Sequence, residues 1–265
     1  MRYSVSDAAA IQHSGEVRIP ARAAMLEGEL RAPPGARSIV VFAHGSGSSR
    51  FSPRNQSVAQ KLRENGFATL LFDLLTAEEE AIDRVTRYFR FDIGLLAERL
   101  TDATLWILND TDLREMPIGY FGASTGAAAA LMAAAELGDR IGAVVSRGGR
   151  PDLAAPALPS VKSPTLLIVG ALDEQVMRLN ERALALLRCE KRLAIVPGAS
   201  HLFEEPGAMA EVTRLAGAWF ERYLSISSAS SSATGSARQC ARRQWPAPGA
   251  ERFRGLRGRG NLHRL

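Results

Sequence analysis

The sequence predicts an α/β protein with a mostly parallel sheet of about eight strands and helices on both faces. Two observations support this class. Apolar runs of strand length, such as 38–43 and 67–73, are continuous rather than alternating, which is typical of strands covered on both faces. From residue 38 to residue 224 these runs alternate with amphipathic segments of helical spacing, such as 92–108. This alternation predicts parallel strands joined by right-handed crossovers.

The individual elements follow from the local pattern. Residues 16–20 and 25–31 alternate between apolar and polar side chains, which predicts an antiparallel pair at the start of the sheet. Buried strands are expected at 38–43, 67–73, 117–122, 141–146, 165–169 and 191–196. Helices are expected at 55–65, 92–108, 176–187 and 207–224, and directly after Ser124. Segment 74–91 is charged and lacks strong periodicity, so it is interpreted either as an excursion over the site or as a surface loop.

Composition divides the chain into three parts. Residues 1–14 form a small polar N-terminal arm, and residues 15–224 carry the strand and helix pattern of one domain. Residues 225–265 are rich in serine, glycine and arginine without periodicity, which predicts a basic, disordered tail. The tail carries a net charge of +7 and the remainder −2. The net positive charge of the chain therefore comes from the tail and does not indicate a nucleic-acid-binding domain.

The apolar runs, the N-terminus and the cysteines favour a cytoplasmic protein without a transmembrane helix. The apolar runs are shorter than a membrane span, and the N-terminus lacks a basic region followed by an apolar run. Cys189 and Cys240 lie in different parts of the chain, so we expect no disulfide and a reducing compartment. No Cys/His cluster has the spacing of metal ligands, and we expect neither a metal nor another cofactor.

The stretch 118–131, IGYFGASTGAAAAL, combines an apolar strand, a glycine-rich turn and an alanine-rich helix. It contains G-x-S-x-G between the strand and the helix, which predicts a nucleophile elbow with Ser124 exposed at the end of the sheet. Glycines on either side of the serine lack the Cβ atoms that would collide with neighbouring backbone. The alternative interpretation is an ordinary turn in which Ser124 only caps the helix.

A serine nucleophile needs a base and an orienting acid. Asp173 and His201 each follow a later predicted strand, so both are expected at the same edge of the sheet as Ser124. The chain order Ser, Asp, His is the one expected of α/β-hydrolases, with Asp152 as the reserve acid. Taken singly, Asp173 also fits a helix cap and His201 a surface loop histidine.

The oxyanion hole requires two backbone N–H groups aimed at the developing charge. One is expected from Thr125, the residue after the nucleophile, and the other from the loop after strand 38–43. In that loop Ser46 is the first candidate and Gly47 the second. His44 is interpreted as a structural loop histidine rather than a second base.

With these motifs, the chain resembles the α/β-hydrolase superfamily and, within it, the dienelactone hydrolase-like family, in the branch often fused to phosphoribosyltransferase domains. The resemblance rests on 43–76, 118–131, VVSRGGRPDLA (144–154), TLLIVGALDEQV (165–176) and VPGASHLFEEPGA (196–208). It spans most of residues 16–224 and none of the tail. Dienelactone hydrolases use cysteine as the nucleophile, whereas this chain has Ser124, which favours a general esterase.

Four arginines also follow predicted strands: Arg50, Arg54, Arg147 and Arg150. A guanidinium that faces the site would bind a carboxylate or phosphate of the substrate through paired hydrogen bonds. Arg147 is the candidate substrate-binding residue because it follows a buried strand directly. The expected partner is a small-molecule ester, with no nucleic acid or membrane, and the oligomeric state is open.

These residues together predict a serine hydrolase that cleaves an ester, lactone or thioester through an acyl-enzyme. One alternative is a catalytically silent α/β-hydrolase fold that serves as an interaction module. Another is a Rossmann-type nucleotide-binding protein, because G-x-G follows strand 38–43 and Asp73 ends the next strand. Arg50 stands where that fingerprint has its third glycine, and the nucleotide interpretation leaves Ser124, Asp173 and His201 unexplained.

Overall fold

The computed structural model describes residues 14–22, 24–110 and 112–225. Ser14 is the one described residue of the expected arm, and Ser225 is the one described residue of the expected tail. The remainder of both segments lies outside the described residues.

Eight strands form a single sheet in the order β1-β2-β4-β3-β5-β6-β7-β8. They are β1 (Gly15–Ala21), β2 (Ala24–Arg31), β3 (Ile39–Ala43), β4 (Ala68–Phe72), β5 (Ile118–Ala123), β6 (Ile141–Arg147), β7 (Thr165–Gly170) and β8 (Lys191–Val196). β2 pairs antiparallel with β1 and β4, and all other pairs are parallel. The expected mostly parallel sheet with an antiparallel pair at its start is confirmed.

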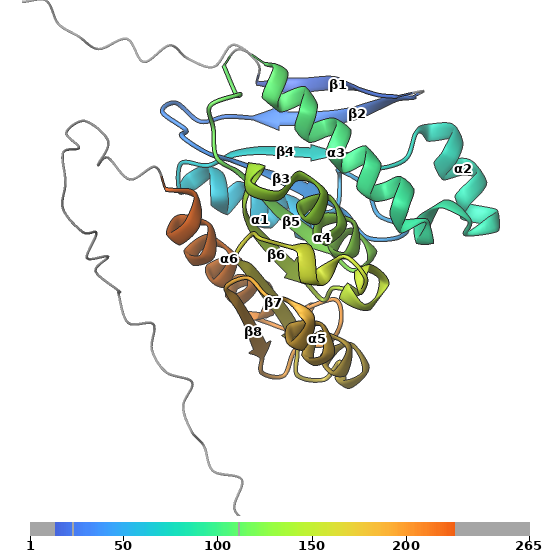
Figure 1. Cartoon of the computed structure of the whole chain (residues 1–265), viewed down its shortest axis with the longest axis vertical. Helices are drawn as coiled ribbons and strands as arrows, with labels where there is room; N and C mark the ends of the chain where they lie inside the picture. Colours follow the sequence, from blue (N-terminus) through green and yellow to red (C-terminus); the bar gives the residue numbers. More distant parts are fainter. Residues whose placement is uncertain (1–13, 23, 111, 226–265) are drawn as a thin grey trace, which may run out of the picture. The chain divides into compact units, whose positions relative to one another are not determined.

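Helices cover both faces of the sheet (Figure 1). They are α1 (Pro53–Glu64), α2 (Ala77–Thr86), α3 (Ile93–Asn109), α4 (Thr125–Leu137), α5 (Glu174–Leu186) and α6 (Ala208–Leu224). Figure 1 shows α3, α4 and α5 on the near face and α1 and α6 behind the sheet. β3, β4, β5 and β7 are buried along their whole length, as their continuous apolar runs predicted.

Segment 74–91 contains a helix that the periodicity did not predict. Thr76 caps α2 through a capping box with Glu79, in which each side chain bonds the backbone N–H of the other residue. Thr-x-x-Glu was therefore the signal in the sequence. α2 is polar apart from a few positions. Glu79 also forms an ion pair with Arg99 of α3 at 2.8 Å. The interpretation as a plain surface loop is therefore wrong for Ala77–Thr86, and the interpretation as an excursion over the site stays a prediction.

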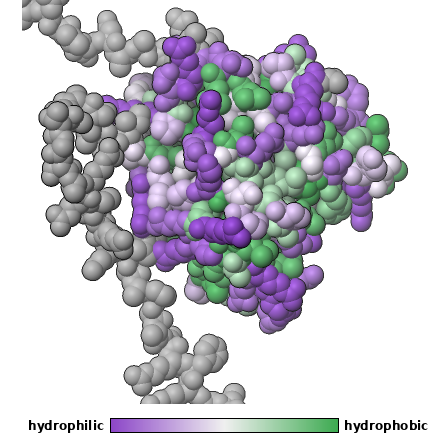
Figure 2. Space-filling view, viewed as in Figure 1, coloured by the Kyte–Doolittle hydropathy of each residue, from purple (hydrophilic) through white to green (hydrophobic). Residues whose placement is uncertain are grey.

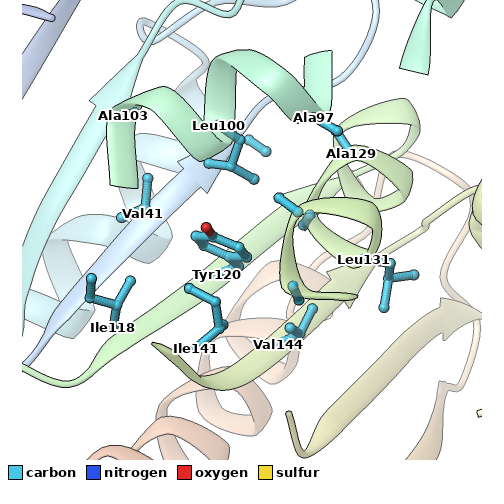
Figure 3. Close-up of a cluster of buried hydrophobic side chains, with 14 of the residues drawn as sticks. Val41, Ala97, Leu100, Ala103, Ile118, Tyr120, Ala129, Leu131, Ile141 and Val144 are labelled. Carbon is cyan, nitrogen blue, oxygen red and sulfur yellow. The ribbon is translucent and has the colours of Figure 1, made fainter. Parts of the chain in front are cut away.

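The core between the sheet and the near helices is built around Tyr120 of β5 (Figure 3). Its ring is fully buried, and its hydroxyl lies 2.5 Å from Thr104 Oγ1 of α3. Burial raises the pKa of the Tyr120 phenol, because the charged form would be poorly solvated there. Leu100 of α3 and Val144 of β6 pack around the same ring. This packing anchors β5, the strand that leads into the serine turn.

The surface mixes polar and apolar residues. Figure 2 shows hydrophilic and hydrophobic residues interspersed over one face of the molecule. Two large hydrophobic side chains are exposed on α2, Ile82 at 51% and Val85 at 86%. Across the described ranges, no helix has both the length and the apolar character that spanning a bilayer requires.

Candidate active site

Ser124 occupies the turn between β5 and α4 in a conformation that L-residues rarely adopt. Its φ is 51° and its ψ is −120°. Such a backbone geometry costs about 1–3 kcal/mol and persists only where the surroundings impose it. The Ser124 side chain forms no capping hydrogen bond to α4. The interpretation of Ser124 as an ordinary helix cap is therefore wrong, and its hydroxyl is available for another role.

Two glycines allow the strand and the helix to approach each other at this turn. A Cβ on Gly122 would lie 2.5 Å from Ala127 Cα, and a Cβ on Gly126 would lie 2.2 Å from the Ala43 carbonyl oxygen. Both distances are far below van der Waals contact with backbone atoms that have no room to move. The G-x-S-x-G spacing thus follows from the packing of α4 against β3 and β5.

Asp173 and His201 form a hydrogen-bonded pair. Asp173 Oδ2 lies 2.6 Å from His201 Nδ1, although the two residues are 28 positions apart in the chain. The Asp173 side chain is 14% exposed and that of His201 40% exposed. Asp173 also caps α5, since its Oδ1 accepts the Val176 N–H at 3.4 Å. The carboxylate therefore caps α5 and also bonds the imidazole, and no described residue forms a hydrogen bond with His201 Nε2.

The His201 ring lies beside the strand that borders the serine turn. A Cβ on Gly148 would lie 3.6 Å from His201 Cε1, and the carbonyl of the preceding Arg147 accepts the Ser124 N–H at 3.2 Å. The described residues show no hydrogen bond between the Ser124 hydroxyl and the ring. Catalytic hydrogen bonds of this kind often tighten only when substrate is bound.

The loop after β3 packs directly against the turn. A Cβ on Gly45 would lie 3.0 Å from Ser124 Cβ, and Ser46 Oγ lies 3.0 Å from Thr125 Oγ1. Among the hydrogen bonds of the described residues, none is donated by the backbone N–H of Ser46 or of Thr125. The structure thus brings the side chains of the two expected oxyanion residues into contact, and the role of their N–H groups stays a prediction.

His44 serves the loop as a structural group. Its Nε2 accepts the Leu74 N–H at 3.0 Å, and its Nδ1 donates to the Gly45 carbonyl at 3.0 Å. These partners require the neutral ring, and burial lowers the pKa of His44. A ring with both nitrogens engaged is not available as a base.

Asp83 and Arg90 support residues 44–47, the candidate oxyanion loop, and were not found from the sequence. Asp83 is fully buried and accepts hydrogen bonds from the backbone N–H of Arg90 at 2.9 Å and from its Nε at 2.6 Å. The Arg90 carbonyl in turn accepts the Ser46 hydroxyl at 3.3 Å. The segment that follows α2 thereby holds one side chain of the oxyanion loop. Asp83 and Arg90 both lie in segment 74–91. Because no helix was expected there, nothing in the sequence connected this pair to Ser46.

The strand-end arginines differ in their partners. Arg50 forms an ion pair with Asp73. This ion pair engages the carboxylate that a nucleotide-binding protein would use to bind a ribose. Arg150 binds Asp152 through two hydrogen bonds of 2.9 and 2.8 Å, so the reserve acid is engaged away from the histidine. Arg147 is 8% exposed and forms no ion pair with any described residue.

A groove of about 1300 Å³ opens beside this edge of the sheet. It is lined by the loop 46–54 and by residues 75–80 at the start of α2, and it includes Ser46 and Arg54. Ser124 and His201 do not line it, so the groove meets the site at the oxyanion loop. Within the described part of the chain, no group of three or more His, Cys, Asp or Glu residues is placed to hold a metal ion.

The strand order, together with the strand–serine–helix turn between β5 and α4, defines an α/β-hydrolase fold. Solved structures share it. Est1E from Butyrivibrio proteoclasticus covers 79% of this chain and 98% of its own, with a TM-score of 0.67 at 16% identity. An alpha-beta serine hydrolase homologue from Coxiella burnetii covers 78% of this chain and 97% of its own, with a TM-score of 0.65 at 19% identity. At these identities the likeness concerns the fold alone.

The chain belongs to the Dienelactone hydrolase family, which residues 26–229 match. The crystal structure of a dienelactone hydrolase from Anabaena variabilis is 58% identical to it. That structure covers 80% of this chain and 99% of its own, with a TM-score of 0.79. The resemblance read from the motifs is confirmed, and the family and fold support a hydrolase.

Two curated proteins of Mycobacterium tuberculosis, from strains CDC 1551 and H37Rv, are each 55% identical to this chain over 209 residues. Both are named "Putative phosphoribosyl transferase". The alignment covers 79% of this chain but 46% of theirs, so the chain spans about half the length of the curated relatives it matches. Their name fits the expected fusion with phosphoribosyltransferase domains.

Proposed function

We propose that the chain is a serine hydrolase that cleaves a carboxylic ester, lactone or thioester through an acyl-enzyme on Ser124. The observation that carries this proposal is the conformation of Ser124, strained at φ 51° with a hydroxyl that caps nothing. A fold that holds a serine in this way at the carboxyl end of its sheet presents the hydroxyl for attack. Family membership supports the hydrolytic class.

The proposed reaction uses only side-chain and backbone groups of the site. Ser124 Oγ attacks the carbonyl carbon while His201 Nε2 takes its proton. The N–H groups of Ser46 and Thr125 bind the oxyanion that forms. The bond to the leaving group then breaks, and His201 returns the proton to the departing alcohol or thiol. Water attacks the acyl-enzyme with His201 as base again, which releases the acid and restores Ser124.

Asp173 supports this cycle by orienting the imidazole. Its carboxylate accepts a hydrogen bond from His201 Nδ1–H at 2.6 Å, which leaves Nε2 as the acceptor for the serine proton. The negative charge also stabilises the imidazolium formed during attack. We propose that this chemistry acts on a small-molecule ester in the cytoplasm.

Labelling with a fluorophosphonate probe tests the mechanism. The wild type and a Ser57→Ala control, changed at an exposed serine of α1, should be labelled, whereas Ser124→Ala should not be. Equal labelling of Ser124→Ala would show that the nucleophile is wrong. If neither the wild type nor the control is labelled while both are folded, the chain is a silent member of the fold that serves as an interaction module.

Turnover of p-nitrophenyl acetate provides the second test. Ser124→Ala should lose at least about a thousandfold in kcat, which is the scale seen when a triad member is removed. A panel of p-nitrophenyl esters from short to long acyl chains then defines the acyl length that the site accepts. Turnover by Ser124→Ala at the wild-type rate would refute the acyl-enzyme.

A further inference from the structure

Arg147 carries a buried charge that no described residue neutralises with a carboxylate. The residue is 8% exposed, and its Nε is buried without a hydrogen-bond partner. By contrast, Arg50 and Arg150 at neighbouring strand ends are each paired with a carboxylate. Burying an unpaired charge is costly, because the solvation that is lost is not replaced. A guanidinium kept in this state is a candidate binding group for an anion from outside the chain.

A second arginine meets the same chain segment, because Arg147 faces the Phe203 ring and Arg54 forms an ion pair with Glu204. Arg54, in the first turn of α1, also has a buried Nε without a partner. Its NH1 contacts Glu204 at 3.2 Å, but that carboxylate is 65% exposed. Burial first and the positive charge of Arg54 second lower the pKa of Arg147 to about 10. Two like charges repel each other, and an anion bound by both would turn this repulsion into attraction.

Both guanidinium groups border the candidate active site. Arg147 Cζ lies 6.0 Å from the centre of the Phe203 ring, and Arg54 contacts Glu204, so both meet the loop that follows His201. On the other side, the Arg147 carbonyl accepts the N–H of Ser124 at 3.2 Å. A group bound at the two arginines would therefore sit within one small molecule's reach of the serine. The amino end of α1 adds its positive dipole to the same region.

We propose that Arg147 and Arg54 form an anion subsite that binds a phosphoryl group of the substrate, so that the scissile ester or thioester belongs to a phosphorylated molecule. A carboxylate has two oxygens and is satisfied by one guanidinium fork. Two forks with unpartnered Nε groups can use the three terminal oxygens of a phosphoryl group. The position of the scissile bond rests on the proposed serine mechanism, whereas anion binding at the two arginines does not.

Binding of inorganic phosphate tests the subsite without any reaction. Phosphate at neutral pH and low ionic strength should raise the melting temperature of the full chain in a saturable way. Arg147→Met should abolish this response, and Arg147→Lys should weaken it about tenfold because lysine lacks the fork. Arg150→Met is the matched control, since it removes an arginine that already has its own carboxylate, and its response should equal that of the wild type.

The melting temperature without phosphate adds a second readout. Replacing a buried unpaired charge by an apolar side chain of similar length should leave stability unchanged or increase it. A fall in the melting temperature of Arg147→Met, with an unaltered phosphate response in the variant that remains folded, would show a structural role and overturn the subsite. An equal response of the wild type to malonate and to phosphate would overturn the assignment to a phosphoryl group.

Two matched substrates connect the subsite to the reaction. The enzyme should hydrolyse acetyl glycerol phosphate with a higher kcat/KM than monoacetylglycerol, and Arg147→Met should lower the first value roughly 10- to 100-fold while sparing the second. Phosphate binding without hydrolysis of either ester would refute the serine mechanism and leave the subsite standing. Equal hydrolysis of both esters without phosphate binding would refute the subsite and leave the mechanism standing.

Discussion

Replacing Gly126 by alanine should disrupt the serine turn through steric overlap alone. The new Cβ would lie 2.2 Å from the Ala43 carbonyl oxygen and 2.3 Å from that of His44. Both are backbone atoms at the end of a central, fully buried strand, so neither can yield cheaply. Overpacking of this kind costs about 3 kcal/mol. For a domain of this size, that corresponds to a fall of about 6–12 °C in melting temperature.

The activity should fall further than stability explains. Relief of the overlap must move α4 or the carbonyl groups that precede Ser46, and both changes displace an oxyanion donor. A shift of this kind costs about a hundredfold in kcat. Scanning calorimetry and p-nitrophenyl acetate turnover below the melting range measure the two effects separately.

Gly217→Ala in α6 is the matched control. There the new Cβ meets Asn65 Nδ2 at 3.5 Å, an ordinary contact, so the helical propensity of alanine should stabilise the protein by about 0.5–1 kcal/mol. If Gly126→Ala melts at the wild-type temperature and keeps full activity, the close approach of α4 to β3 is not what requires the glycine. The steric explanation of the G-x-S-x-G spacing would then be wrong.

Three further changes have distinct expected outcomes. Ser124→Gly should relieve the strain at φ 51° and raise the free energy of unfolding by about 1 kcal/mol, whereas Ser124→Ala should not; urea denaturation compares them. Asp173→Asn should lower kcat about a thousandfold at unchanged stability because asparagine still caps α5, and a stability loss equal to that of Asp173→Ala would contradict this. His44→Gln should flatten the acid side of the stability profile. Below pH 6.5 the His44 ring of the unfolded wild type binds a proton that the buried ring does not bind. The free energy of unfolding of the wild type therefore falls, as pH decreases, by up to about 1.4 kcal/mol per pH unit. Parallel profiles of the two proteins would count against the buried neutral ring.

Much of the fold could be predicted because its information is local. The strands of the sheet centre were visible as continuous apolar runs, and the serine turn was visible because two glycines and a serine must stand at fixed spacing. The predicted bounds of strands and helices differ from the observed ones by a residue or two. α2 was missed because it is a surface helix with few apolar positions, although its capping box was present in the sequence.

The sequence by itself determined the type and chain order of the candidate catalytic residues. Only the tertiary structure decided which side chains meet. It pairs Asp173 rather than Asp152 with His201, because the crossovers bring the loops after β7 and β8 together while Asp152 turns back to Arg150. Among the described residues, it also leaves Arg147 without a carboxylate although other strand-end arginines are paired. Helix, strand and turn preferences arise from neighbouring residues, whereas the partner of a charge depends on distances of a few ångströms between segments far apart in the chain.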